Sequence, residues 1–127
     1  MTDREQLAHG FLTAWNDRDW TALERLCHPV IVIQAPEGWP ETGEFHGWAA
    51  VRAQWERLKE PFDDDRVEYL DVEDLDDETM LTHTRWRGTG ASGLEMDLEA
   101  WLVIRFRGDL LIRVEYYFDE AKAREAA

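Results

Sequence analysis

The residues best equipped for acid–base chemistry lie close together near the end of this 127-residue chain. The segment RVEYYFD, residues 113–119, holds two phenols and two carboxylates. A carboxylate and a phenol that share one pocket could move a proton to and from a substrate. Whether these four side chains converge depends on the secondary structure that carries them.

Alternating apolar and polar residues predict that this segment belongs to a β-sheet. Alternation places Tyr116 on the inner face of its strand and Glu115 with Tyr117 on the outer face. The inner set of this strand is expected to be Leu110, Ile112, Val114, Tyr116 and Phe118. Asp119 is placed to cap a short final helix. The four groups therefore cannot share one site, and Tyr116 alone is expected to face inward.

Other segments predict the elements around this strand. Period-two patterns predict strands at residues 67–73, 79–87, 94–107 and 110–118, and the run VIVIQA predicts a buried strand at 30–35. Helical spacing of apolar residues predicts three helices, at about 2–16, 20–28 and 48–58. Thr2 and Glu5 form a capping box for the first helix, Asp19 caps the second, and Pro29 is expected to end it. Residues 36–47 and 63–65 read as loops, with a short strand near Phe45.

Three helices followed by a curved sheet predict one α+β domain over residues 1–127. A net charge of −14 disfavours nucleic acid and anionic membranes as partners, and it favours a neutral or apolar small molecule. Cys27 is the only cysteine, and no apolar run is long enough to span a bilayer, so we expect a cytoplasmic protein. The four histidines show no metal-ligand spacing, and we expect neither a metal nor a cofactor.

Four segments carry a resemblance to a known family: AWNDRDWTALERLCHP, GEFHGWAAVRAQW, GTGASG and RVEYYFDEAKAREA. With the order of elements, they resemble the SnoaL-like branch of the nuclear transport factor 2 superfamily, over about residues 7–126. The resemblance implies a cystatin-like cone, in which an antiparallel or mixed sheet wraps around three helices, with a deep apolar pocket inside. Related enzymes are ketosteroid isomerases, limonene epoxide hydrolase and polyketide cyclases, so the fold alone does not define the activity.

The resemblance also implies positions for catalytic groups. The tyrosine, the base and the oxyanion-stabilising acid of ketosteroid isomerases align with Phe11, Ala35 and Leu102, which are all apolar. Tyr116 occupies the last-strand position where epoxide hydrolases and cyclases keep an acid. Arg85 lacks the partner acid that an epoxide hydrolase would need. These acid–base arrangements are therefore not carried over to this chain.

The aromatic residues predict the walls of a pocket. We expect it to be lined by Phe11, Trp15, Trp55, Trp86, Ala100, Leu102, Val114 and Phe118, with Tyr116 as its main polar group. Trp39 is a candidate lid. A three-residue turn at 107–109 with Gly108 at positive φ would pair Phe106 with Leu110. That register would set Tyr116 opposite the small side chain of Ala100 and leave room for its hydroxyl.

The outer face of the sheet carries more apolar surface than a solvated face needs. The resemblance implies a homodimer through this face, and the expected interface residues are Trp101, Val103, Arg113, Glu115 and Tyr117. Partial cover by the chain's own ends is the alternative.

Three functions remain open from the sequence. The first is binding of a small, largely apolar organic molecule. The second is an isomerase, cyclase or dehydratase in which Tyr116 works with His83 or Arg85 to polarise a carbonyl. The third is a structural homodimer without a ligand. A ligand-sized cavity would exclude the third, and a histidine or carboxylate beside Tyr116 would favour the second.

Overall fold

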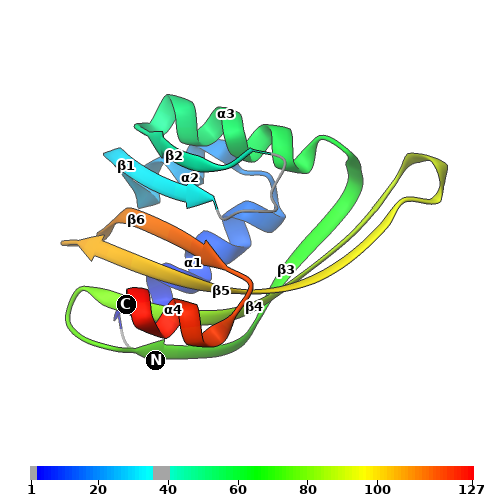
Figure 1. The fold of residues 1–127 in the computed structure, drawn as a ribbon. Coiled ribbons are helices and arrows are strands. Elements are labelled where there is room, and N and C mark those ends of the chain that lie inside the picture. The colour runs from blue at the N-terminus through cyan, green and yellow to red at the C-terminus, as the bar shows by residue number, and fades with distance from the viewer. Residues whose placement is uncertain (1–2, 36–40) are drawn as a thin grey trace.

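A computed structural model describes residues 3–35 and 41–127 and shows a curved mixed sheet that wraps around three helices (Figure 1). The helices are α1 (Asp3–Asn16), α2 (Trp20–Leu26), α3 (Trp48–Lys59) and α4 (Glu120–Ala126), with a 3-10 turn η1 (Ala91–Gly93). The strands are β1 (Cys27–Ala35), β2 (Gly43–His46), β3 (Phe62–Asp74), β4 (Thr79–Gly90), β5 (Glu95–Arg107) and β6 (Leu110–Tyr117). The predicted α+β cone is confirmed; Thr2 of the capping box and Trp39 lie outside the described residues.

The sheet has the strand order β2-β1-β6-β5-β4-β3. Only β1 and β6 pair in parallel; the other neighbours are antiparallel. The inner face packs on α1, α2 and α3, whose buried residues recur at helical spacing, for example Ala8, Phe11 and Trp15 in α1. Asp19 caps α2 as predicted, accepting a hydrogen bond from the backbone N–H of Ala22.

Two predicted boundaries are wrong. Pro29 does not end a helix, because α2 stops at Leu26 and Pro29 lies inside β1. The pairing of β1 with β6 is irregular between Cys27 and Val32, so a residue without an N–H is tolerated there. Residues 63–65 are not a loop, because β3 already begins at Phe62, and Asp65 points into the protein and is buried.

The β5–β6 hairpin differs from its predicted register. Arg107 pairs with Leu110, so the turn has two residues, and Gly108 has the expected positive φ of 61°. The register then shifts between Arg105 and Phe106, and Ile112 is the extra residue of a bulge. Leu111 therefore packs inward, fully buried, contrary to prediction.

The bulge lies before Val114, so the predicted inward direction of Val114 and Tyr116 is retained. Their partners nevertheless change, because Tyr116 lies opposite Leu102 instead of Ala100. Ala100 lies opposite Thr84 on the other side of β5.

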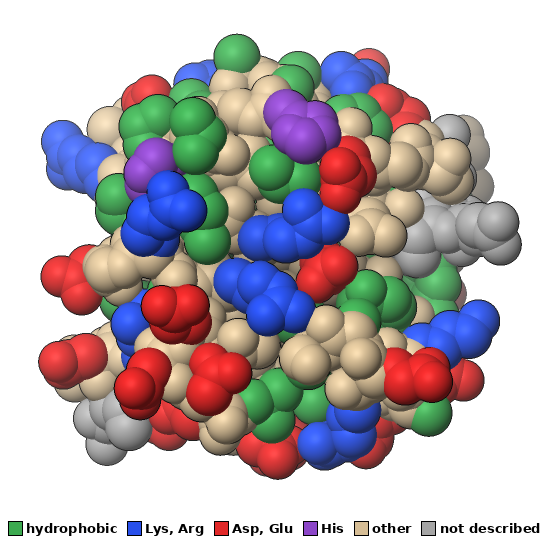
Figure 2. Space-filling model, turned by 60° about the vertical axis from the view of Figure 1, so that its left-hand side comes forward, with side chains coloured by type: hydrophobic (Ala, Val, Ile, Leu, Met, Phe, Trp, Pro, Cys, Tyr) green, Lys and Arg blue, Asp and Glu red, His purple; other side chains and the backbone are tan. Residues whose placement is uncertain are grey.

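The C-terminal helix α4 covers part of the outer face of the sheet. Val103 has no exposed surface and packs with Leu81 and Ala123, and Trp101 and Tyr117 pack against this small cluster. Val103 is therefore unavailable to a partner, contrary to expectation, because the chain's own end covers it. On the face shown in Figure 2, acidic and basic side chains lie beside one another with small apolar areas between them.

The close approach of β3 and β4 at Gly90 gives a stability prediction. A Cβ at Gly90 would lie 2.2 Å from the backbone oxygen of Pro61, the residue before β3. Gly90→Ala must therefore push β4 away from the start of β3. We expect a loss of about 2 kcal/mol in the free energy of unfolding, measured by chemical denaturation. The control is Gly10→Ala in α1, where the nearest atom is 3.8 Å from the added Cβ. That variant is expected to gain about 0.5 kcal/mol, because alanine favours the helix; equal effects of the two variants would contradict the packing argument.

Candidate functional site

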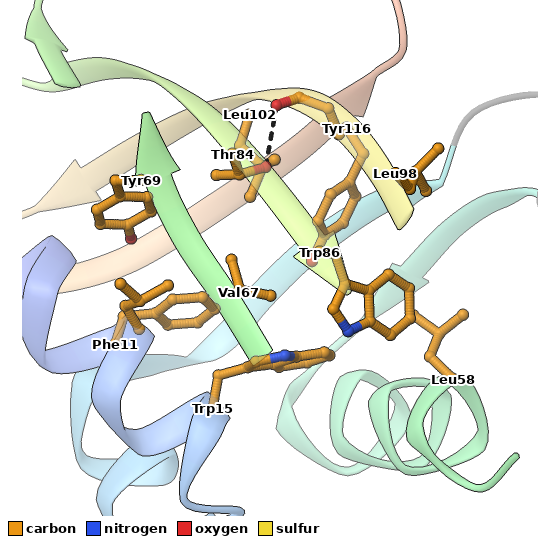
Figure 3. A pocket seen from close by; sticks show the side chains of 12 residues that line it. Phe11, Trp15, Leu58, Val67, Tyr69, Thr84, Trp86, Leu98, Leu102 and Tyr116 are labelled. Atoms are coloured by element: carbon orange, nitrogen blue, oxygen red, sulfur yellow. Dashed lines mark hydrogen bonds between the residues drawn. The ribbon is translucent and has the colours of Figure 1, made fainter. Parts of the chain in front are cut away.

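A cavity lies between α1, α3 and the inner face of the sheet (Figure 3). Five aromatic rings form much of its wall: Phe11, Trp15, Tyr69, Trp86 and Tyr116. The rest is Ala100, Thr84 and the aliphatic side chains Leu12, Leu58, Val67, Leu98 and Leu102. The centre of a water molecule can occupy about 60 Å³ of it. At 10–15 Å³ for each water, this is room for roughly four to six small atoms before any side chain moves.

Six of the residues predicted to face a ligand line this cavity. They are Phe11, Trp15, Trp86, Ala100, Leu102 and Tyr116. Trp55 and Val114 are fully buried in the core and are not among the lining residues. Phe118 is 40% exposed, because β6 ends at Tyr117 and the chain turns toward α4. Its prediction as a wall of the pocket is wrong.

Tyr116 lines the cavity, and its hydroxyl group contacts the buried Trp55. Its oxygen accepts a hydrogen bond of 3.0 Å from the indole N–H of Trp55. Burial raises the pKa of Tyr116, and the bond from Trp55 lowers it by less. Burial likewise raises the pKa of Tyr69, with a smaller contribution from Tyr116. Both phenols therefore stay protonated at neutral pH and cannot serve as general bases there.

His83 and Arg85 lie on the other face of the sheet, which corrects their prediction as partners of Tyr116. Alternation along β4 turns Thr84 and Trp86 inward and His83 and Arg85 outward. His83 stacks on Trp101 with ring centroids 4.4 Å apart and lies 2.9 Å from a carboxylate oxygen of Glu99. Arg85 donates two hydrogen bonds to Asp97, of 2.8 and 2.6 Å. Neither side chain can act on a molecule in the cavity.

A buried ion pair lies behind Trp15 and Trp86 of the cavity wall, and the sequence pattern did not predict it. Lys59, only 2% exposed, donates hydrogen bonds of 2.8 Å to Asp65 and to the backbone oxygen of Trp15. The indole N–H of Trp86 donates to the same carboxylate at 2.9 Å, and Arg18 donates to its other oxygen at 3.0 Å. We call these four side chains, Arg18, Lys59, Asp65 and Trp86, the buried charge cluster.

Within this cluster, Lys59 and Asp65 stabilise each other's charge. Burial alone would raise the pKa of Asp65, but the hydrogen bonds from Lys59 and Trp86 and the charge of Lys59 hold it below its ordinary value. Burial lowers the pKa of Lys59, and Asp65 opposes this only in part. The ammonium nitrogen also lies 4.2 Å from the centroid of the Trp15 ring. The cluster therefore orients both Trp15 and Trp86 in the cavity wall.

Some of the missed residues leave a signal in the sequence. Val67 and Tyr69 have the alternation of an inward strand face, which predicts that they line the cavity once β3 is recognised as an inner strand. Asp65 has the same parity, but a run of three aspartates reads as solvated, and nothing local points to Lys59 as its partner. The partner comes from the end of α3, and only the tertiary fold brings it there.

The α+β cone is the fold of a class of solved structures described as nuclear transport factor 2-like. Within that class, the chain belongs to the SnoaL-like domain family, which matches residues 8–114. No curated protein matches the chain in sequence.

Solved structures with the same fold cover nearly all of the chain. TerC, co-crystallized with polyporic acid, has a TM-score of 0.81 and 16% identity, covering 98% of this chain and 97% of that one. Bal32a, from a soil-derived mobile gene cassette, has a TM-score of 0.80 and 21% identity, covering 98% of each chain. A protein from Catenulispora acidiphila with a ketosteroid isomerase-like fold, in complex with trimethylamine, has a TM-score of 0.76 and 11% identity, covering 89% and 85%. At these identities the likeness concerns the fold.

Residues 3–35 and 41–127 contain no group of three histidine, cysteine or acidic side chains arranged to hold a metal ion. No helix in these ranges is long and apolar enough to cross a membrane. Cys27 is buried, and burial raises the pKa of its thiol to about 12, so it is not a nucleophile at neutral pH.

The buried charge cluster gives a prediction on stability. Asp65→Asn leaves the ammonium of Lys59 buried without its counter-charge, and we expect the free energy of unfolding at pH 7 to fall by about 3 kcal/mol. The control is Asp64→Asn, one residue earlier on β3 and exposed, which should change stability little.

The same variant has a pH signature. The pKa of Asp65 is lower in the folded state, so its stabilisation is complete above the unfolded value of about 4 and is lost as the pH falls through the folded value. Denaturation between pH 2.5 and 7 should show a shallower acid dependence for Asp65→Asn than for the wild type. An unchanged acid dependence would show that Asp65 has no depressed pKa.

Proposed function

We propose that this protein binds a small, largely apolar organic molecule in the cavity of the cone. The observation that carries the proposal is the chemistry of the wall. Five aromatic rings and six aliphatic side chains line the cavity, and no carboxylate, histidine, lysine or arginine is among the described lining residues. Burial of an apolar ligand against such a wall is favourable, and few polar groups must lose water.

The volume of the cavity favours a ligand of modest size. A cavity of about 150 Å³ holds a benzene molecule, so 60 Å³ is less than half of that space, and a ligand of about six heavy atoms requires side-chain movements that enlarge the cavity. Leu12, Leu58 and Leu98 are only partly buried and have room to make those movements. Polyporic acid and trimethylamine accompany two proteins of the same fold, which supports a binding role for the cone.

Tyr116 is the proposed polar contact for the ligand. Its ring lies in the wall, and the bond from Trp55 fixes the position of its oxygen. A protonated phenol in an apolar surrounding exchanges hydrogen bonds with a neutral ligand without transferring a proton. Ligand binding is therefore favoured over the hypothesis of an isomerase, cyclase or dehydratase, because that hypothesis requires His83 or Arg85 beside Tyr116.

A thermal-shift screen of small apolar alcohols, ketones and terpenoids tests the proposal. A ligand of the cavity should raise the Tm of the wild type, and Tyr116→Phe should reduce the shift because the variant loses one hydrogen bond of about 1 kcal/mol. The matched control is Tyr117→Phe, whose hydroxyl donates to Glu115 on the outer face and should leave the shift unchanged. Equal shifts in all three proteins would remove Tyr116 from the site.

We also propose a homodimer through the outer face of the sheet, with Trp101, Tyr117 and Arg113 at its centre. Trp101 and Tyr117 are only partly buried, although Val103 beside them is covered by α4. Glu115 is 8% exposed, and its oxygens lie 3.7 Å from Arg105 and 3.6 Å from Arg113, longer than a hydrogen bond. Arg113 also donates to Gln34 and Glu44, and Arg105 donates to the backbone oxygen of Ala126. Paired polar groups therefore surround the aromatic residues, as at the polar rim of an interface.

Sedimentation equilibrium tests the association. The wild type should sediment with about twice the chain mass of 14.9 kDa, and Trp101→Glu should sediment as a monomer. Leu94→Glu, at an exposed position near the tip of the β4–β5 hairpin, serves as the control and should remain dimeric. A wild type that is monomeric at all concentrations would contradict the proposal.

A further inference from the structure

Two hydroxyl-bearing side chains stand next to each other in the wall of the cavity. Tyr69 of β3 and Thr84 of β4 are register partners, and both line the cavity. Ala100 follows in the same row on β5, and its small side chain leaves space above the sheet. Figure 3 shows Tyr69 and Thr84 on the same side of the cavity, with Phe11 and Trp15 across from them.

The hydrogen atoms of both hydroxyls are already used. Tyr69 donates to the backbone oxygen of Ala8 at 2.7 Å, and Thr84 donates to the backbone oxygen of Ala100 at 2.9 Å. A carbonyl oxygen can only accept, so the proton must come from the hydroxyl in each case. What the two oxygens still offer to a ligand is lone pairs. This pair of groups can therefore accept a hydrogen bond and cannot donate one to a carbonyl.

A donor without a partner occurs in the same wall. The indole nitrogen of Trp15 is buried and has no hydrogen-bond partner among the described residues. An unpaired buried N–H is costly, so a ligand atom that accepts from it would be stabilised. A hydroxyl group can donate to the oxygens of Tyr69 or Thr84 and can also accept a hydrogen bond. A ketone can only accept, and a hydrocarbon can do neither.

The charges behind the wall favour a neutral ligand. The ammonium of Lys59 lies 4.2 Å from the centroid of the Trp15 ring, and Arg18 is bound to the same carboxylate of Asp65. Two cations and one carboxylate leave a positive excess beside the cavity, which opposes an ammonium ligand. An anion would lose its hydration in an apolar cavity without gaining a direct ion pair, because none of the described lining residues is a cation.

We propose that the cavity selects a small neutral alcohol over the ketone or hydrocarbon of the same size. The inference rests on the proposed function, since it names the chemical class that the binding cavity recognises. The relevant molecules are compact, with about six heavy atoms and one hydroxyl group.

The test is an NMR titration of the full-length, ¹⁵N-labelled protein with cyclopentanol, cyclopentanone and cyclopentane. The three molecules share one ring, and the indole N–H signals of the tryptophans report binding. Cyclopentanol should bind about fivefold more tightly than cyclopentanone, the effect of one additional net hydrogen bond of about 1 kcal/mol. Cyclopentanone binding equally or more tightly would overturn the alcohol inference and leave the proposed function standing. Absence of binding by all three would count against both.

Substitutions of Tyr69 and Thr84 test which oxygen accepts the hydrogen bond from the alcohol. Thr84→Val and Tyr69→Phe each remove one accepting oxygen. A ligand hydroxyl has one hydrogen and donates to one of these oxygens, so one of the two variants should lower the ratio of cyclopentanol affinity to cyclopentane affinity by about threefold to fivefold. The matched control is Thr82→Val, which removes a fully buried hydroxyl that has no partner among the described residues and is not in the cavity wall. This variant should keep the wild-type ratio. The ratio is insensitive to a general loss of packing, because both ligands share one ring. An unchanged ratio in both variants, or an equal fall in Thr82→Val, would overturn the assignment.

Discussion

The ion pair between Lys59 and Asp65 is the interaction on which the geometry of the cone depends. It joins the last residue of α3 to β3, and the same two groups bind the end of α1 through the oxygen of Trp15 and β4 through the indole of Trp86. An ammonium with almost no access to water requires both of its acceptors, Asp65 and the oxygen of Trp15, and the indole of Trp86 donates to the same carboxylate. The helices and the sheet are thereby held at one separation, and the cavity is the space that this separation leaves beside Trp15 and Trp86.

The sheet divides the polar chemistry of the protein between two faces. Strict alternation after the bulge at Ile112 sends Tyr116 inward and Glu115 and Tyr117 outward. Among the described residues, the polar groups that line the cavity are hydroxyl and indole groups. His83 and Arg85 of β4 pair with Glu99 and Asp97 of β5 on the other face. Within RVEYYFD, the phenol of Tyr116 is therefore separated from Glu115 and Tyr117 by the thickness of the sheet.

Local patterns in the sequence were sufficient for most of the elements and for half of the residues in the cavity wall. The apolar spacing of α1 and the alternation of β5 predict Phe11, Trp15, Ala100 and Leu102 as inward residues, because burial imposes these periods on a helix and a strand. The register of β6 was not predictable in this way, since one inserted residue changes the partners without changing the composition. The position of Asp65 was missed for a different reason. A buried acid is stabilised by a cation from elsewhere in the fold, which a local pattern does not contain.

The C-terminal helix has a consequence for association. Ala123 of α4 fills the space over Val103, the oxygen of Ala126 accepts a hydrogen bond from Arg105, and Arg124 pairs with Glu73 of β3. Because α4 is tethered to the sheet by a few residues, it occupies this surface at a high effective concentration that a separate chain must exceed. The last seven helical residues thus act as an intramolecular competitor, which limits how much of the sheet a second subunit can reach.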